Sequence, residues 1–155
     1  MTETRVREAT PGDTDTLLSL WTALVDYHKS IERVRPTRWL GSVGETLRPL
    51  LEQVWAAPDR HTIFVAEIVG DVVGFVRVSL TEDRPCPARI DTLFVAEGFR
   101  GRRVGTRLLD CAYAWCRQRR AEEVAVAFIA PNDLAREFYD RAGFQPLLAT
   151  YIRRL

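Results

Sequence analysis

The sequence has few cysteines, and they follow no recognisable pattern. Cys86, Cys111 and Cys116 are odd in number and show no C-x-x-C spacing, which argues against a disulfide framework or a cysteine-rich metal site. Cys111 and Cys116 lie five positions apart on an expected helix, so they do not share a face. We therefore predict reduced thiols and a cytoplasmic protein.

Long hydrophobic runs are also missing. No apolar stretch approaches the length of a membrane-spanning helix. The first residues lack the apolar segment of a signal peptide, so we expect neither a membrane partner nor a leader.

Neither sign of charge is in excess. The chain has 22 basic and 21 acidic residues and a net charge of +1, which gives no reason to expect a nucleic acid or a membrane surface as partner. Its two histidines have no matching cysteine or acidic spacing, so we expect no metal. For a chain of 155 residues we expect one domain over residues 1–155, with a hydrophobic core that is stable without a disulfide or a structural metal.

Hydrophobic periodicity predicts an α/β order of elements. The strand-like segments are Arg5–Ala9, Thr62–Ile68, Val72–Leu80, Ile90–Val95, Glu123–Ile129 and Leu147–Ile152. Four helices are expected, beginning near Thr10, Ser42, Arg103 and Asn132. The near-continuous apolar content of Glu123–Ile129 predicts a buried strand. A Gly70-Asp71 pair between the second and third strands predicts a hairpin.

The segment Arg100–Thr106 follows the strand Ile90–Val95 and opens a helix. Backbone N–H groups at a helix start, with small residues that allow close approach, can bind a phosphate group. One alternative is a surface helix start with solvated arginines. Another is a nucleic-acid patch that also includes Arg107, which the balanced charge and the lack of interleaved aromatics disfavour.

A second motif covers Asn132–Phe144 on a short helix that Gly143 should end. Its central aromatic pair is Phe138 and Tyr139. Tyr139 is either a catalytic phenol or a core aromatic, and Asn132 can cap the helix whatever else it does.

Together the two motifs resemble motifs A and B of the GNAT superfamily of N-acetyltransferases. The pattern Asn-x-x-Ala-x-x-Phe-Tyr-x-x-x-Gly-Phe is complete, and Arg/Gln-x-x-Gly-x-Gly/Ala is matched except that Arg103 replaces its first glycine. The resemblance implies an α/β fold with a mixed, mostly antiparallel twisted sheet of about six to seven strands and helices on both faces. It also implies a V-shaped gap between the strands at Ile90 and Glu123 that admits the pantetheine arm of a CoA thioester.

The resemblance implies acetyl-CoA as cosubstrate and a role for each motif residue. Tyr139 would protonate the departing thiolate, and Asn132 would contact the pantetheine arm. Backbone groups of the preceding strand would bind the pantetheine amide, and those of the loop would bind the pyrophosphate; the residues concerned are Leu93, Phe94, Val95, Arg100, Gly101, Arg102, Arg103, Val104, Gly105 and Thr106.

Asp91 is an acidic residue in an otherwise apolar strand, which is costly unless it faces a cleft. Alternation predicts that it shares a face with Arg89 and Leu93. It is either the general base or counter-ion for an amine, or a partner in a salt bridge with Arg89 or another cation. For the acceptor, the candidates are Tyr27, His28 and Trp39, although His28 lies on the apolar stripe of its helix and is typical of a boundary histidine.

These observations predict an N-acetyltransferase that acts on a primary amine of a small molecule. The alternatives are a protein or peptide N-acetyltransferase, or a non-catalytic CoA-binding module. No acidic cluster in the sequence favours a polycationic acceptor. The last strand, Leu147–Ile152, can pair at an exposed edge and so permits a homodimer.

Overall fold

A computed structural model describes residues 3–31, 43–82, 86–151 and 153, with the backbone alone for residues 43–45. Its elements follow the predicted order through the last helix. They are β1 (Thr4–Glu8), α1 (Thr14–Ile31), α2 (Val43–Ala56), β2 (His61–Ile68), β3 (Asp71–Leu80), β4 (Ala88–Val95), α3 (Val104–Gln118), β5 (Val124–Val126) and α4 (Asp133–Arg141). Short 3-10 turns at Pro11–Asp13 and Glu97–Phe99 precede α1 and α3.

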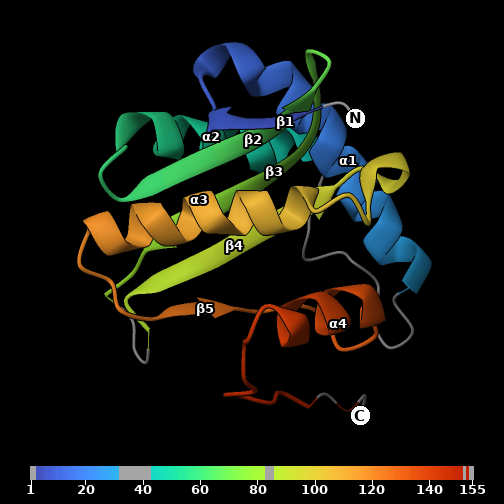
Figure 1. Ribbon diagram of the computed structural model, residues 1–155, viewed down its shortest axis with the longest axis vertical. Coiled ribbons are helices and arrows are strands. Elements are labelled where there is room, and N and C mark those ends of the chain that lie inside the picture. Colours follow the sequence, from blue (N-terminus) through green and yellow to red (C-terminus); the bar gives the residue numbers. More distant parts are fainter. Residues whose placement is uncertain (1–2, 32–42, 83–85, 152, 154–155) are drawn as a thin grey trace.

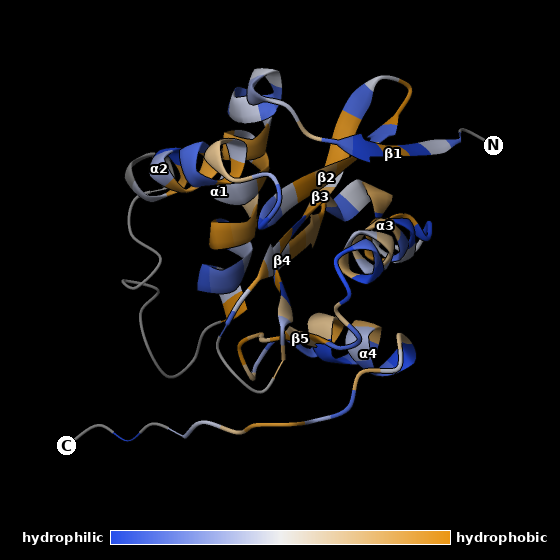
Figure 2. Cartoon of the chain, turned by 90° about the vertical axis from the view of Figure 1, so that its left-hand side faces the viewer, coloured by the Kyte–Doolittle hydropathy of each residue, from blue (hydrophilic) through white to orange (hydrophobic). Residues whose placement is uncertain are grey.

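The strands form one sheet in the order β1-β2-β3-β4-β5. The first four are antiparallel to their neighbours, and β5 is parallel to β4. Helix α3 crosses one face, and α1 and α2 cover the other (Figures 1 and 2). The mixed, mostly antiparallel sheet with helices on both faces is therefore confirmed.

Alternation along β3 divides the core into two halves. Val76 faces α3, where it joins a buried cluster with Ile90 and Leu108. Phe75 faces the opposite way and packs with Leu17 and other apolar residues of the α1–α2 side. Both faces of the central strands are thus buried, which explains their nearly continuous apolar sequence.

The sheet has five strands rather than six or seven, because the chain beyond α4 forms none among the described residues. The expected strand Leu147–Ile152 is wrong for residues 147–151, and Ile152 lies outside the described part. Leu147, Leu148 and Tyr151 are 67%, 88% and 94% exposed. This segment runs away from the body (Figure 2) and pairs with none of the described strands, and an apolar pattern without a paired neighbour does not make a strand.

The strand expected at Glu123–Ile129 is also shorter than predicted. Only Val124–Val126 pairs with β4, and these residues are half-buried, so the expectation of a buried strand is wrong. The three cysteines are free thiols, as expected. Burial raises the pKa of Cys111 and Cys116. Among the described helices, none is long and apolar enough to span a membrane.

Candidate active site

Strands β4 and β5 separate after a short parallel ladder. Their last paired residues are Ile90 and Val126, whereas β4 continues to Val95. The edge of β4 beyond Ile90 therefore has no strand beside it on this side. A gap of this kind was expected from the resemblance, and it exposes strand backbone to any ligand that enters.

A cavity of about 590 Å³ occupies this region. Its walls come from α1, the end of β4, the turn before α3, the segment after β5, and α4. It contains most of the residues singled out from the sequence: Tyr27, His28, Asp91, Leu93, Phe94, Val95, Arg100, Gly101, Gly105, Asn132 and Tyr139. Arg102, Arg103, Val104 and Thr106 are not in its wall, and Trp39 lies outside the described residues.

The start of α3 has the features of an anion seat. Gly101 and Arg103 have φ values of 75° and 61°, in the left-handed region, so the chain turns sharply before the helix begins at Val104. No side chain caps this helix start, which leaves its first N–H groups for an external acceptor. Arg103 is exposed, so its side chain does not fill the seat. These features fit a diphosphate.

The arginines of this region do not form one basic patch. Arg100 folds back toward the cavity, where its Nε donates to the carbonyl oxygen of Val95 at 3.0 Å and its guanidinium lies 5.0 Å from the ring centre of Tyr27. Arg107 donates to the carbonyl oxygen of Thr4 at 2.9 Å and so holds β1. These contacts favour neither a nucleic-acid surface nor a row of solvated charges.

Asn132 links the two sides of the cavity. Its Oδ1 accepts from the N–H of Ala135 at 3.0 Å, which caps α4. The same atom accepts from the hydroxyl of Tyr27 at 3.3 Å. The capping role is confirmed, and Tyr27, a candidate for the acceptor site, is in the cavity wall.

Tyr139 is buried, with 5% of its surface exposed. Its ring stacks on Phe128 at 5.6 Å and meets Phe138 and Phe144 edge-on at 5.2 and 5.3 Å. Burial, with a smaller effect of Tyr113, raises its pKa well above the usual range of a phenol. The hydroxyl therefore stays protonated at neutral pH and can act as a proton donor.

Asp91 lies at a bulge in β4. Ile90 pairs with Val78 and Thr92 pairs with Arg77, so the ladder skips Asp91. The bulge breaks the alternation on which the sequence prediction depended. Asp91 faces Arg89, as expected, but Leu93 packs on the α3 side of the sheet.

The carboxylate of Asp91 lies between two guanidinium groups. Its Oδ2 is 3.9 Å from Nε of Arg77, and its Oδ1 is 4.0 Å from Nε of Arg89. Both separations are too long for a hydrogen bond. The salt bridge considered from the sequence is therefore present in a loose form, and a second cation joins it.

His28 is half-buried in the cavity wall, at the boundary position that its place on the helix suggested. Burial lowers its pKa below the usual value of 6.5. The imidazole is therefore neutral at physiological pH.

A family model described as the acetyltransferase (GNAT) family matches residues 21–144. The chain belongs to the GNAT acetyltransferase family. An uncharacterized N-acetyltransferase of Methanocaldococcus jannaschii is 37% identical to this GNAT chain over 92 residues. That match covers 56% of this chain and 40% of the relative, so the chain matches less than half the length of that relative.

Solved structures share the fold of this GNAT chain. The BH1408 protein of Bacillus halodurans superposes with a TM-score of 0.78 and 20% identity, over 97% of this chain and 99% of its own. The aminoglycoside N-acetyltransferase AAC(6')-Iy in complex with CoA gives a TM-score of 0.75 and 20% identity, over 100% of this chain and 96% of its own. At this identity the likeness establishes the fold.

Sequence reasoning missed two residues of this GNAT site. Phe128 lies after β5 in the cavity wall and stacks on Tyr139, but it was assigned to a buried strand. Arg77 was overlooked although it is a charged residue within an apolar run. A charged residue within an apolar strand could have indicated a nearby opposite charge, because a charge on a central strand needs a partner.

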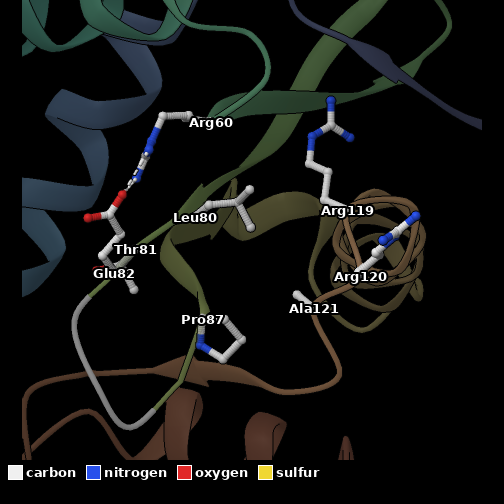
Figure 3. Close-up of a pocket in the computed structure, with 8 residues that line it drawn as sticks. All are labelled: Arg60, Leu80, Thr81, Glu82, Pro87, Arg119, Arg120 and Ala121. Atoms are coloured by element: carbon white, nitrogen blue, oxygen red, sulfur yellow. Dashed lines mark hydrogen bonds and ion pairs between the residues drawn. The ribbon is translucent and has the colours of Figure 1, made fainter.

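A second hollow, of about 240 Å³, lies at the opposite end of the sheet and is lined by arginines (Figure 3). Arg60 pairs with Glu82 at 3.3 Å. Arg119 lies 4.0 Å from the ring centre of Trp115 and donates to the carbonyl oxygen of Asp59 at 3.0 Å. These two side chains have structural partners, so the hollow is a weaker candidate for the active site of a GNAT protein.

Proposed function

We propose that this chain transfers the acetyl group of acetyl-CoA to a primary amine of a small molecule by direct attack. The main support is that one cavity is lined by the loop before α3, the unpaired edge of β4 and Tyr139. These supply an anion seat, free strand backbone and a neutral acid along a single path. Membership of an acetyltransferase family makes the same chemistry the first expectation.

Acetyl-CoA supplies an activated acetyl group as a thioester. The N–H groups of Arg102–Thr106 bind its diphosphate. Backbone groups of Leu93–Val95 and the side chain of Asn132 hold the pantetheine arm. An N–H group of β4 beside the acetyl carbonyl would stabilise negative charge on its oxygen.

Two side chains move protons in this proposal. Asp91, directly or through a water molecule, accepts the proton of the attacking amine. Tyr139 donates its phenolic proton to the departing sulfur, which makes the thiolate a better leaving group. A phenol with its ordinary pKa of about 10 is already protonated at neutral pH, and burial raises the pKa of Tyr139 further, so the proton is present when the reaction begins.

The size of the cavity supports a small-molecule acceptor. The cavity volume of about 590 Å³ lies in the range of small-molecule sites. The fold neighbour AAC(6')-Iy is named for an aminoglycoside acceptor, which shows that such a fold can hold a small amine. A protein or peptide acceptor, and a CoA-binding module without turnover, are the alternatives.

Thermal unfolding with acetyl-CoA, CoA and ATP tests the cosubstrate. Acetyl-CoA and CoA should raise the midpoint, with about 2.7 kcal/mol of stabilisation at a hundredfold excess over Kd, while ATP should not. Thiol release with a panel of amines and peptides then tests turnover. Binding without release from any acceptor would favour the module, and release with peptides alone would favour the second enzyme class.

A further inference from the structure

Strand β3 carries a buried arginine beside the proposed base. The strand is otherwise apolar through its centre, and the side chain of Arg77 is only 14% exposed. A buried charge is costly unless an opposite charge accompanies it. Asp91 supplies that charge, with its side chain 16% exposed and Oδ2 3.9 Å from Nε of Arg77.

This pair leaves hydrogen-bonding capacity unused. Nε of Arg77 and Oδ2 of Asp91 are both buried, and neither has a hydrogen-bond partner. Buried polar atoms are rarely left unpaired. Since Asp91 lines the cavity, its carboxylate can accept a hydrogen bond from an ammonium group of a bound molecule.

Arg89 lies outside the cavity wall, beside Asp91 on β4, and brings a second positive charge to the same carboxylate. Its Nε lies 4.0 Å from Oδ1 of Asp91, and its side chain is 50% exposed. No other carboxylate of the described residues lies within salt-bridge distance of Arg89. Because one carboxylate balances one guanidinium, and the buried Arg77 needs it more, the charge of Arg89 is in excess.

The rest of the cavity adds no acidic group. Among the described lining residues Asp91 is the sole carboxylate, while Arg100 and Arg141 are basic. Burial lowers the pKa of His28, and burial together with Arg77 lowers that of His61, so neither imidazole is charged at neutral pH. A single carboxylate thus lies in a positive surrounding.

We propose that the acceptor is a small amine that also carries an acidic group, with its ammonium at Asp91 and its acidic group at Arg89. This inference rests on the proposed acetyl transfer and names its substrate class. Arg77 is not in the cavity wall, so it balances the charge of Asp91 and does not itself contact the acceptor. An acceptor with several positive charges would meet Arg100 and Arg141 in the cavity wall and Arg89 beside Asp91, with one carboxylate to receive it, and is disfavoured.

Matched acceptors test this assignment by thiol release from acetyl-CoA. Glycine, β-alanine, 4-aminobutyrate and taurine vary the distance and kind of acidic group. Glycinamide and β-alaninamide are the matched compounds without an acidic group. Spermidine and kanamycin are the polycationic comparison compounds. At least one acidic amine should have a kcat/KM about tenfold above that of its amide, and above both polycations.

Substitutions at Arg89 test whether this residue causes the preference for amines that carry an acidic group. Arg89→Gln should raise the KM for the acidic amine about tenfold, and the KM for its amide should change much less. Arg89→Lys should restore part of the preference. Arg5→Gln, which removes an exposed charge from β1, is the matched control and should change nothing.

The outcomes separate the two proposals. Equal or better use of amides or polycations, or the same preference in Arg89→Gln, would overturn the assignment while acetyl transfer stands. Acetyl-CoA binding without release from any of these amines would overturn it as well. Failure to bind acetyl-CoA would remove the proposed function itself.

Discussion

Gly105 of α3 lies directly against Phe138 of α4. A Cβ placed on Gly105 would come within 3.0 Å of Cζ and 3.1 Å of Cε2 of Phe138. Phe138 in turn meets Tyr139 edge-on at 5.2 Å. The glycine of the first motif therefore sets the position of the aromatic pair of the second, which joins the proposed anion seat to the proposed acid.

Gly105→Ala should lower kcat about tenfold, because small displacements of a catalytic group are costly in rate. Alanine is favoured over glycine in helices by up to about 1 kcal/mol, and this gain opposes the cost of the close contact between the new Cβ and Phe138. The free energy of unfolding should therefore change little. Thiol release and urea unfolding measure the two effects. Gly98→Ala is the control, since a Cβ there meets nothing within 4 Å, and an equal loss of kcat in both variants would contradict the coupling.

Tyr139→Phe should lower kcat by about 10² or more while acetyl-CoA binding persists. The substitution removes one oxygen from a ring held by stacking on Phe128 and edge contacts with Phe138 and Phe144, so the fold should remain. Steady-state kinetics and a thermal shift with acetyl-CoA measure both effects. Tyr113→Phe, on α3 outside the cavity wall, is the matched control. Full activity in Tyr139→Phe would assign the phenol a packing role.

The motif residues and the order of elements could be predicted from the sequence because they depend on local patterns. The side of the sheet on which Leu93 lies could not be predicted, because the bulge at Asp91 arises from pairing with β3 and the sequence of β4 alone does not indicate it. The pairing of Arg77 with Asp91 joins residues of two strands, which a single sequence does not align. The length of β5 and the conformation of residues 147–151 depend on whether a neighbouring strand is present, and an apolar pattern in the sequence does not show that.

Arg103→Gly tests how the seat tolerates the missing motif glycine. Arg103 adopts φ 61°, which costs a residue with a Cβ roughly 1–2 kcal/mol. Glycine removes this strain, but its greater conformational freedom in the unfolded state offsets part of the gain in stability. We expect the free energy of unfolding to rise by up to about 1 kcal/mol. Acetyl-CoA affinity should stay within about threefold, because backbone N–H groups make the seat.

Arg120→Gly is the control for this change, since Arg120 also has a positive φ, 62°, at the other end of α3. It should raise stability similarly and leave acetyl-CoA binding unchanged. Urea unfolding and calorimetric titration compare the two. A large loss of affinity in Arg103→Gly alone would mean that the side chain itself binds the diphosphate.

Asp13→Asn should destabilise the junction between β1 and α1. Asp13 accepts from Arg7 at 2.8 and 2.9 Å, and these bonds lower its pKa from 3.8 to about 2. A carboxyl whose pKa is lower in the folded state than in the unfolded state stabilises the folded protein at pH values above its unfolded-state pKa. That stabilisation is lost as the pH falls through the folded-state pKa. The variant should therefore lose about 2 kcal/mol at pH 6, with the difference from wild type vanishing between about pH 4 and 2.

Urea unfolding across this pH range measures the linkage. Asp15→Asn is the control, because Asp15 is 94% exposed and its contact with Arg48 is 3.6 Å long, so its effect should be much smaller. A loss in Asp13→Asn that does not depend on pH would point to packing rather than charge.

The exposed apolar segment after α4 predicts a homodimer. Leu147 and Leu148 are 67% and 88% exposed, and β5 has a single neighbour among the described strands, so a sheet edge and an unpaired apolar segment coexist. Pairing of this segment with a second copy would bury both. Wild type should therefore show a concentration-dependent mass in sedimentation, and Leu147→Lys with Leu148→Lys should give a monomer. Thr150→Lys adds charge to the same exposed segment without removing an apolar group and should remain dimeric, whereas a monomeric wild type at every concentration would show that the segment does not mediate self-association.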